Sequence, residues 1–227
     1  MKSSAVRTRS VPLALAALIA LLAALVALAF SGGEPAQAHV TTSKAPVTAK
    51  QLALRNDMRQ LWEDHIVWTR MVIVSFAADL PDLNPAIDRL LENQGDIGDA
   101  IKPFYGDAAG NQLTALLRDH IIIAADVLAA AKAGDTEALS TALERWYANG
   151  EDIADFLAAA NPASWPRSEM RAMMRDHLDL TTQEAVARLN GDWEADIAAY
   201  DEIHLQILEM ADMLSTGIIS DFPSRFR

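Results

Sequence analysis

A short pattern that contains Asp-His occurs three times in this chain, at nearly equal spacing. Its histidines are His65, His120 and His177, and the two intervals between them are almost the same. The residues shared by the first two copies are Leu61, Asp64, His65 and Ile66 in one and Leu116, Asp119, His120 and Ile121 in the other; Asp176-His177 belongs to a more diverged third copy. Repetition at a constant period indicates one supersecondary unit that is used three times.

The repeated unit is predicted to be a pair of helices. Apolar residues recur every three or four positions, as in the series Leu54, Met58, Leu61, His65, Trp68 and Val72, and this spacing is typical of one helix face. No segment shows a sustained alternation with the two-residue period of a strand. We therefore predict an all-α helical bundle of about six helices, built from three repeated helical hairpins.

Local signals predict where the helices begin and end. Thr48 with Gln51 fits a capping box, Asn84 with Pro85 fits the start of a second helix, and Gly134 fits the end of a third. The expected helices span 48–78, 84 to the Lys102–Gly106 segment, 107–133, 135–161, 166–190 and 192–216. The bundle domain would then cover 48–220, after a linker at 39–47 and before a tail at 221–227.

The segment 1–38 has the organisation of an export signal. Three basic residues precede an apolar run from Val11 to Phe30, and a small-residue stretch ends at Ala38, as at a cleavage site. The apolar run is also long enough to anchor a helix in a membrane, which takes about 20 residues. We expect an extracytoplasmic protein that is either secreted or anchored through residues 11–30.

Composition and charge exclude several classes of function. The chain has no cysteine, which rules out disulfides, thiolate metal sites and cysteine nucleophiles. Loss of residues 1–38 would change the formal net charge from −12 to −14, and such a polyanion repels nucleic acids and anionic membrane surfaces. No nucleic-acid binding and no peripheral membrane binding are therefore expected.

Four of the five histidines lie on the apolar face of their predicted helices. Three equivalent hairpins would place His65, His120 and His177 in one layer of the bundle. His204 lies as far after the Asn190-Gly191 turn as His177 lies before it, so these two would face each other. The sharper hypothesis is a transition-metal site of His65, His120, His177 and His204, with Asp201 completing or orienting it and zinc, copper, iron or manganese bound.

The alternative is a layer of histidines that are only hydrogen-bonded core residues. A buried imidazole without a partner costs roughly 1–3 kcal/mol, so each ring needs one, such as Asn149, Tyr200 or another histidine. Under this alternative the protein is a non-catalytic envelope sensor, adaptor or structural bundle. No catalytic residue is predicted, because the sequence has no nucleophile elbow, zinc-protease or phosphate-loop motif.

Four segments resemble a family of bacterial proteins of unknown function. They are Trp62–Arg70, Ile101–Gly106, Arg145–Asn149 and Asp179–Thr182, and the similarity covers about residues 52–223. Members of this family carry inconsistent enzyme labels, such as acetylglutamate kinase and glycosyltransferase. The resemblance implies no function, and this chain has neither the glycine-rich phosphate loop nor the alternating strands and helices that those labels require.

Overall fold

The computed structural model describes residues 46–227, and the predicted export segment and nearly all of the predicted linker lie outside them. The described residues form six α-helices, one short 3-10 helix and no strand, as the sequence predicts for an all-α bundle. The elements are α2 (Ala49–Ala77), α3 (Leu83–Tyr105), α4 (Asp107–Ala133), α5 (Thr136–Ala160), α6 (Arg167–Asn190), α7 (Trp193–Asp221) and η1 (Pro223–Phe226).

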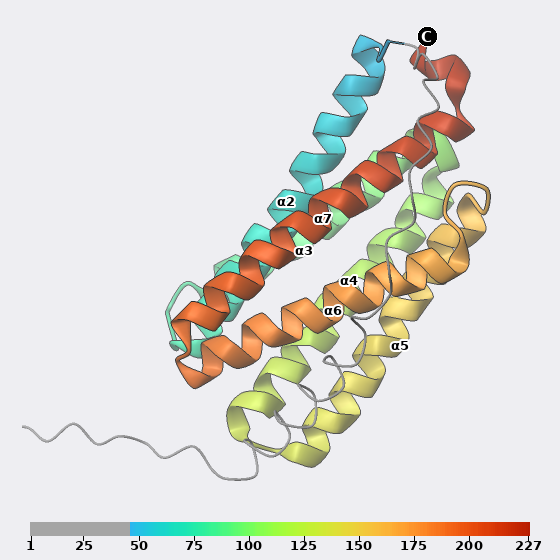
Figure 1. Cartoon of the computed structure of the whole chain (residues 1–227). Helices are drawn as coiled ribbons and strands as arrows, with labels where there is room; N and C mark the ends of the chain where they lie inside the picture. Colours follow the sequence, from blue (N-terminus) through green and yellow to red (C-terminus); the bar gives the residue numbers. More distant parts are fainter. Residues whose placement is uncertain (1–45) are drawn as a thin grey trace, which may run out of the picture. The chain divides into compact units, whose positions relative to one another are not determined.

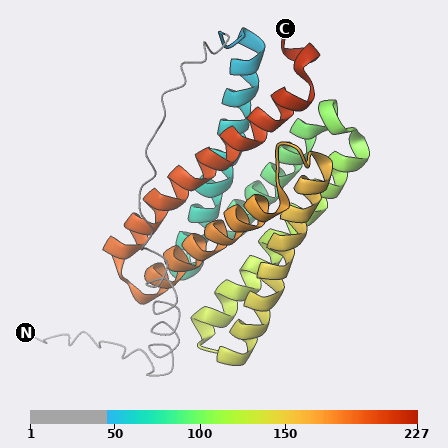
Figure 2. The same ribbon diagram turned by 45° about the vertical axis from the view of Figure 1, so that its right-hand side comes forward.

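The six helices follow one another around a closed ring. Each helix packs against the next one in the chain, and α7 packs against α2, which closes the ring. Figures 1 and 2 both show α7 lying along α2. Alternate helices of the ring, α2, α4 and α6, also contact one another. We call these three the inner helices, because they meet inside the ring.

Several helix ends lie where local chemistry predicts them. The Thr48 side chain accepts a hydrogen bond from the Gln51 backbone N–H, and the Gln51 side chain accepts one from Thr48 N–H, which completes the capping box. Asp135 caps α5 in a similar way, and Asp192 caps α7. Gly134 ends α4 with a φ of 69°, a left-handed conformation that glycine adopts without strain.

Two predicted helix ends are wrong. Helix α3 begins at Leu83 after Asp82, not after a cap at Asn84. The Asp82 carboxylate accepts a hydrogen bond from Ser75 Oγ at 2.8 Å, so it is held by α2 and does not cap α3. Helix α7 continues to Asp221, beyond the predicted end at about Thr216.

The predicted tail is part of the packed structure. Residues Pro223–Phe226 form the 3-10 helix η1, and Phe226 is buried against Phe104, with ring centroids 5.8 Å apart. Thr48 Oγ1 donates a hydrogen bond of 2.8 Å to the Phe226 carbonyl. The two ends of the described chain are therefore fastened to each other.

Glycine allows a close approach between α3 and α4. A Cβ atom added to Gly98 would lie 2.6 Å from the Gly110 carbonyl oxygen and 2.0 Å from Thr114 Oγ1. Both distances are far shorter than ordinary van der Waals contact, and one of them involves rigid backbone. By contrast, a Cβ atom added to Gly95, one turn earlier on α3, would meet nothing within 4 Å.

Candidate functional site

The three histidines of the repeated pattern come from the three inner helices. His65 lies on α2, His120 on α4 and His177 on α6, with exposures of 3%, 3% and 5%. The rings of His65 and His177 have centroids 5.8 Å apart, and His120 interacts electrostatically with both. The structure thus brings together three of the four predicted histidines, and we call them the histidine centre.

Each ring of the histidine centre contacts a side-chain amide on the next helix. The His120 Nδ1 atom lies 2.8 Å from Asn149 Oδ1, and the His177 Nδ1 atom lies 3.2 Å from Gln206 Oε1. His65 Nδ1 lies 3.2 Å from Gln94 Nε2. In every pair the amide follows its histidine by 29 residues. Asn149 is thus the partner that the sequence proposed for a core histidine.

The amides also bind the backbone one turn before each histidine. Asn149 Nδ2 donates to the Leu116 carbonyl, and Gln206 Nε2 donates to the Met173 carbonyl, each at 3.1 Å. In the first hairpin two neighbouring residues share these contacts, because Asn93 donates to the Leu61 carbonyl while Gln94 contacts His65. These bonds fix the axial position of each inner helix relative to the helix that follows it.

The amide orientations set the tautomers of the three rings. Because the NH₂ groups of Asn149 and Gln206 point to carbonyls, their oxygens face the rings, and His120 and His177 donate from Nδ1. Gln94 instead presents its nitrogen, which also donates to the Leu90 carbonyl at 2.8 Å, so His65 Nδ1 accepts. Neutral His65 therefore carries its proton on Nε2, whereas His120 and His177 leave Nε2 unprotonated.

Burial keeps the histidine centre uncharged at neutral pH. Desolvation lowers the pKa of His120 and of His177 to about 4. For His65, burial comes first, followed by repulsion from His177 and His120, and its pKa lies well below the ordinary value. The hydrogen bond between each ring and its amide raises the pKa of that histidine, but by less than burial lowers it. The three rings are neutral hydrogen-bonding groups, not cations.

Two tryptophans contact the histidine centre. Trp62 meets His65 edge-on with centroids 5.8 Å apart, and Trp146 stacks on His120 at 5.2 Å. Both indoles are buried. Within residues 46–227, the N–H groups of both indoles and the Oε1 atom of Gln94 lack a hydrogen-bond partner.

The structure does not place His204 or Asp201 with the other predicted site residues. Gln206 faces His177, and His204 lies two positions earlier on α7, about 200° around the helix. His204 is therefore half-exposed, with Nε2 3.0 Å from Glu63 Oε1. Asp201 is exposed. The predicted meeting of His177 and His204 is wrong.

No metal-binding group is preformed among the residues that the structure describes. Within residues 46–227, no three His, Asp or Glu side chains are placed to hold a metal ion. The three rings are close together, but their Nδ1 atoms are engaged by amides and their tautomers differ.

A group of charged residues with two buried carboxyl groups lies where α2 meets α6 and α7, and no local sequence pattern predicted it. Arg70 Nη1 donates to Glu184 Oε1 at 2.6 Å and to Asp196 Oδ1 at 2.9 Å. Arg188 Nη1 donates to Asp196 Oδ2 at 3.1 Å. Glu184 is 2% exposed and Asp196 is 1% exposed. We call these four residues the ion cluster.

Glu184 has a carboxyl group with a shifted pKa. Burial raises the pKa of Glu184 to about 7, although Arg70 acts in the opposite direction. Tyr200 on α7 covers the other face of Arg70, whose guanidinium carbon lies 4.6 Å from the ring centroid. A carboxyl group that titrates near neutral pH inside a bundle is a candidate for a functional role.

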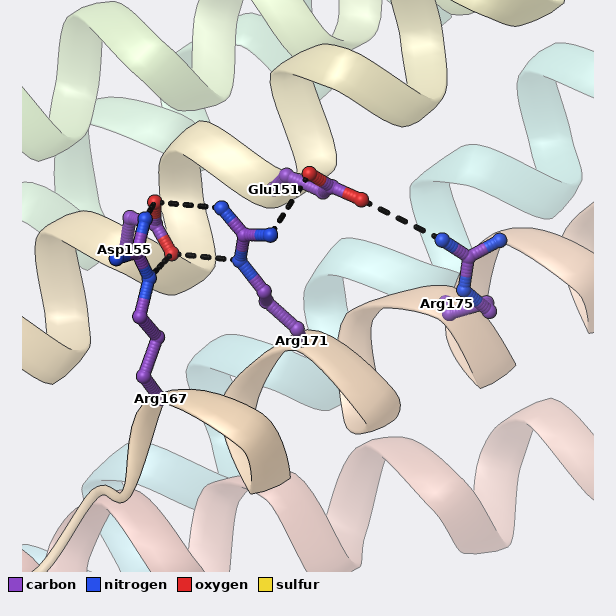
Figure 3. Close-up of polar contacts among 5 residues, drawn as sticks. All are labelled: Glu151, Asp155, Arg167, Arg171 and Arg175. Atoms are coloured by element: carbon purple, nitrogen blue, oxygen red, sulfur yellow. Dashed lines mark hydrogen bonds and ion pairs between the residues drawn. The ribbon is translucent and has the colours of Figure 1, made fainter.

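A second ionic network lies on the surface between α5 and α6, and Figure 3 shows it. Arg171 makes a bidentate contact of 2.8 Å with Asp155 and also reaches Glu151 at 3.1 Å. Arg167 and Arg175 complete the network. Hydrogen bonds from Arg171 and Arg167 lower the pKa of Asp155. Because acidic partners occupy these arginines, the network fastens two helices and offers no free cationic site.

Comparisons with protein families, with curated proteins and with solved structures gave no match. The resemblance to the bacterial family described above therefore stays a prediction. Among residues 46–227, no helix is both long enough and apolar enough to cross a membrane.

Proposed function

We propose that this chain is an exported, non-catalytic helical bundle in which the histidine centre is a structural element. The observation that carries the proposal is the set of three histidine–amide pairs, each separated by 29 residues. In two of them a single amide contacts the histidine ring and also donates a hydrogen bond to the backbone carbonyl one turn before that histidine. Such paired contacts fix the register between two helices, which is a common role of buried polar groups.

The proposal includes a repeated origin for the three hairpins α2–α3, α4–α5 and α6–α7. The constant histidine-to-amide separation supports it, and so does the recurrence of the carbonyl contact at Leu61, Leu116 and Met173. The proposal that the chain is exported rests on the sequence of residues 1–38 alone. The bundle would then act outside the cytoplasm as a sensor, adaptor or structural component.

Metal analysis of the purified protein tests this proposal. We expect no more than trace amounts of zinc, copper, iron or manganese per chain after incubation with each ion and removal of the excess. We also expect the same melting temperature with and without EDTA. Stoichiometric metal that is lost in His120→Ala but kept in His204→Ala would overturn the structural role.

A transition-metal site at His65, His120 and His177 is the second candidate function. The orientation of His120 and His177 favours it, because their Nδ1 atoms donate to amides and leave Nε2 as the coordinating atom. His65 would also need the opposite tautomer, which requires the Gln94 amide to turn over. The same metal analysis separates the two candidates.

A further inference from the structure

The junction between α2 and α7 differs from the other five neighbouring pairs in the described ring, because no loop connects these two helices. Polar contacts hold it at four levels. They join Thr48 to the Phe226 carbonyl, Arg59 to Asp212 at 3.1 Å, Glu63 to His204 at 3.0 Å and Arg70 to Asp196 at 2.9 Å. Three of these four contacts involve groups that carry or can acquire charge, so electrostatics contributes to the closure of the ring.

The ion cluster provides the most deeply buried of these four contacts. Its two carboxyl groups receive unequal numbers of hydrogen bonds from the two arginines. Asp196 accepts from both Nη atoms of Arg70 and from Arg188. Among residues 46–227, Glu184 accepts a hydrogen bond from Arg70 Nη1 alone, and this nitrogen also contacts Asp196. A carboxylate can accept about four hydrogen bonds, so ionised Glu184 is poorly satisfied in its buried position. The uncharged acid needs far less solvation.

We propose that the ion cluster is a proton-operated latch on the α2–α7 junction. While Glu184 carries a proton, Asp196 is the only charged partner of Arg70 within the cluster, and the latch holds α2 against α6 and α7. When Glu184 loses the proton, two carboxylates compete for one Arg70 nitrogen, and the junction opens more often because opening lets water solvate Glu184.

All the charged and titratable groups around Glu184 enter this balance. Arg70 comes from α2, Arg188 from α6 itself, and Asp196 and Tyr200 from α7. Arg70 and Arg188 favour the ionised form of Glu184, whereas Asp196 disfavours it. Burial outweighs the arginines, which is why protonation rather than ionisation closes the latch.

Hydrogen–deuterium exchange of the purified protein at pH 6.0 and pH 8.5 tests the latch. A pKa of Glu184 near 7 in the closed state and near 4.5 in a solvated open state makes opening about tenfold more frequent at pH 8.5, after correction for intrinsic exchange. We expect this loss of protection in residues 66–77 of α2 and 193–203 of α7. Amides at the α4–α5 turn serve as the internal reference and should show no such change.

Two variants identify the group that is responsible. Glu184→Gln should remove the pH response, because its side chain stays neutral. His204→Gln alters a different ion pair on the same junction and should keep the tenfold response. A response that persists in Glu184→Gln, that disappears in His204→Gln, or that is absent from the wild type would overturn the proposal.

A measurement on the unaltered protein keeps the test independent of folding of the variant. The carboxyl carbon of Glu184 can be followed by NMR across the same pH range. A midpoint near 7 that coincides with the change in exchange supports the latch. A midpoint near 4.5 would overturn it.

Discussion

The side-chain oxygen of Gln206 accepts a hydrogen bond from Nδ1 of His177 at 3.2 Å, and this contact repeats the one between Asn149 and His120. The same amides bind carbonyls of α6 and α4. Each amide therefore fixes both the rotation of a ring and the axial position of two helices. This double role makes the amides, as much as the histidines, the residues on which the register of the bundle depends.

Replacing Asn149 should destabilise the bundle strongly. Asn149→Ala leaves the buried Nδ1–H of His120 without a partner, so we expect a loss of about 2–4 kcal/mol in the free energy of unfolding. Urea denaturation at pH 7 measures it. The control is His204→Ala, which removes a half-exposed pair with Glu63 and a ring contact with Tyr200 and should cost at most about 1 kcal/mol. Equal costs for the two variants would contradict the register role.

The protein should lose stability in mild acid. His120 and His177 have a pKa of about 4 in the folded state, below the ordinary value of 6.5 for an exposed histidine, so unfolding takes up protons. Their contribution is complete above pH 6.5 and is lost as the pH falls towards 4, by about 3 kcal/mol for each ring. Because the raised pKa of Glu184 acts in the opposite direction over this range, urea denaturation of Glu184→Gln at pH 7.0, 5.5 and 4.5 follows this loss.

The variant His177→Gln shows whether the acid sensitivity comes from the histidine centre. Removing one buried imidazole should lower the proton uptake on unfolding by about one near pH 5, as read from the slope of stability against pH. His204→Gln, at a half-exposed position, should leave most of that slope in place. If both variants gave the same slope, the buried histidines would not be its source.

Two glycines on α3 should respond in opposite ways to a methyl group. Gly98→Ala brings a Cβ atom against the Gly110 carbonyl and Thr114, so we expect a loss of about 1–3 kcal/mol as the two helices separate. Gly95→Ala meets nothing and should gain about 0.5–1 kcal/mol from helix propensity. Thermal unfolding of the two variants, one turn apart, gives the comparison, and a gain in Gly98→Ala like the one expected for Gly95→Ala would argue against the close α3–α4 contact.

The end of the chain should contribute to stability despite its position. Phe226→Ala removes a ring that is 6% exposed and stacks on Phe104, so we expect a loss of about 3 kcal/mol. Ser224→Ala, at an exposed position on the same 3-10 helix, is the control and should change the stability by less than about 0.5 kcal/mol. A melting temperature unchanged in Phe226→Ala would show that η1 is not part of the core.

Features that depend on neighbours in the sequence could be predicted. The caps at Thr48, Asp135 and Asp192 and the stop at Gly134 act within about one helical turn, so the sequence contains the whole interaction. The helical periodicity is equally local, and it predicted the six helices. Asp82 escaped prediction because its carboxylate is used by Ser75, which belongs to a different helix.

The site could be predicted only in part, because its contacts join distant segments. The repeat placed His65, His120 and His177 at one level, but equal spacing from a turn could not choose between Gln206 and His204, which point in different directions. The constant separation between each histidine and its amide is a signal that would have found Gln94 and Gln206. The ion cluster had no such signal, since Arg70 lies 114 residues from Glu184 and 126 from Asp196.

The hydrogen bond between Thr48 and the Phe226 carbonyl has a consequence for the connectivity of the chain. Because the two ends of the ring lie within 2.8 Å at this point, a short glycine-serine linker could join them. New N- and C-termini could then be introduced at the α4–α5 turn or at the α6–α7 turn. Such circular permutants should fold to the same ring of helices, since its geometry does not depend on which of the six junctions lacks a peptide link.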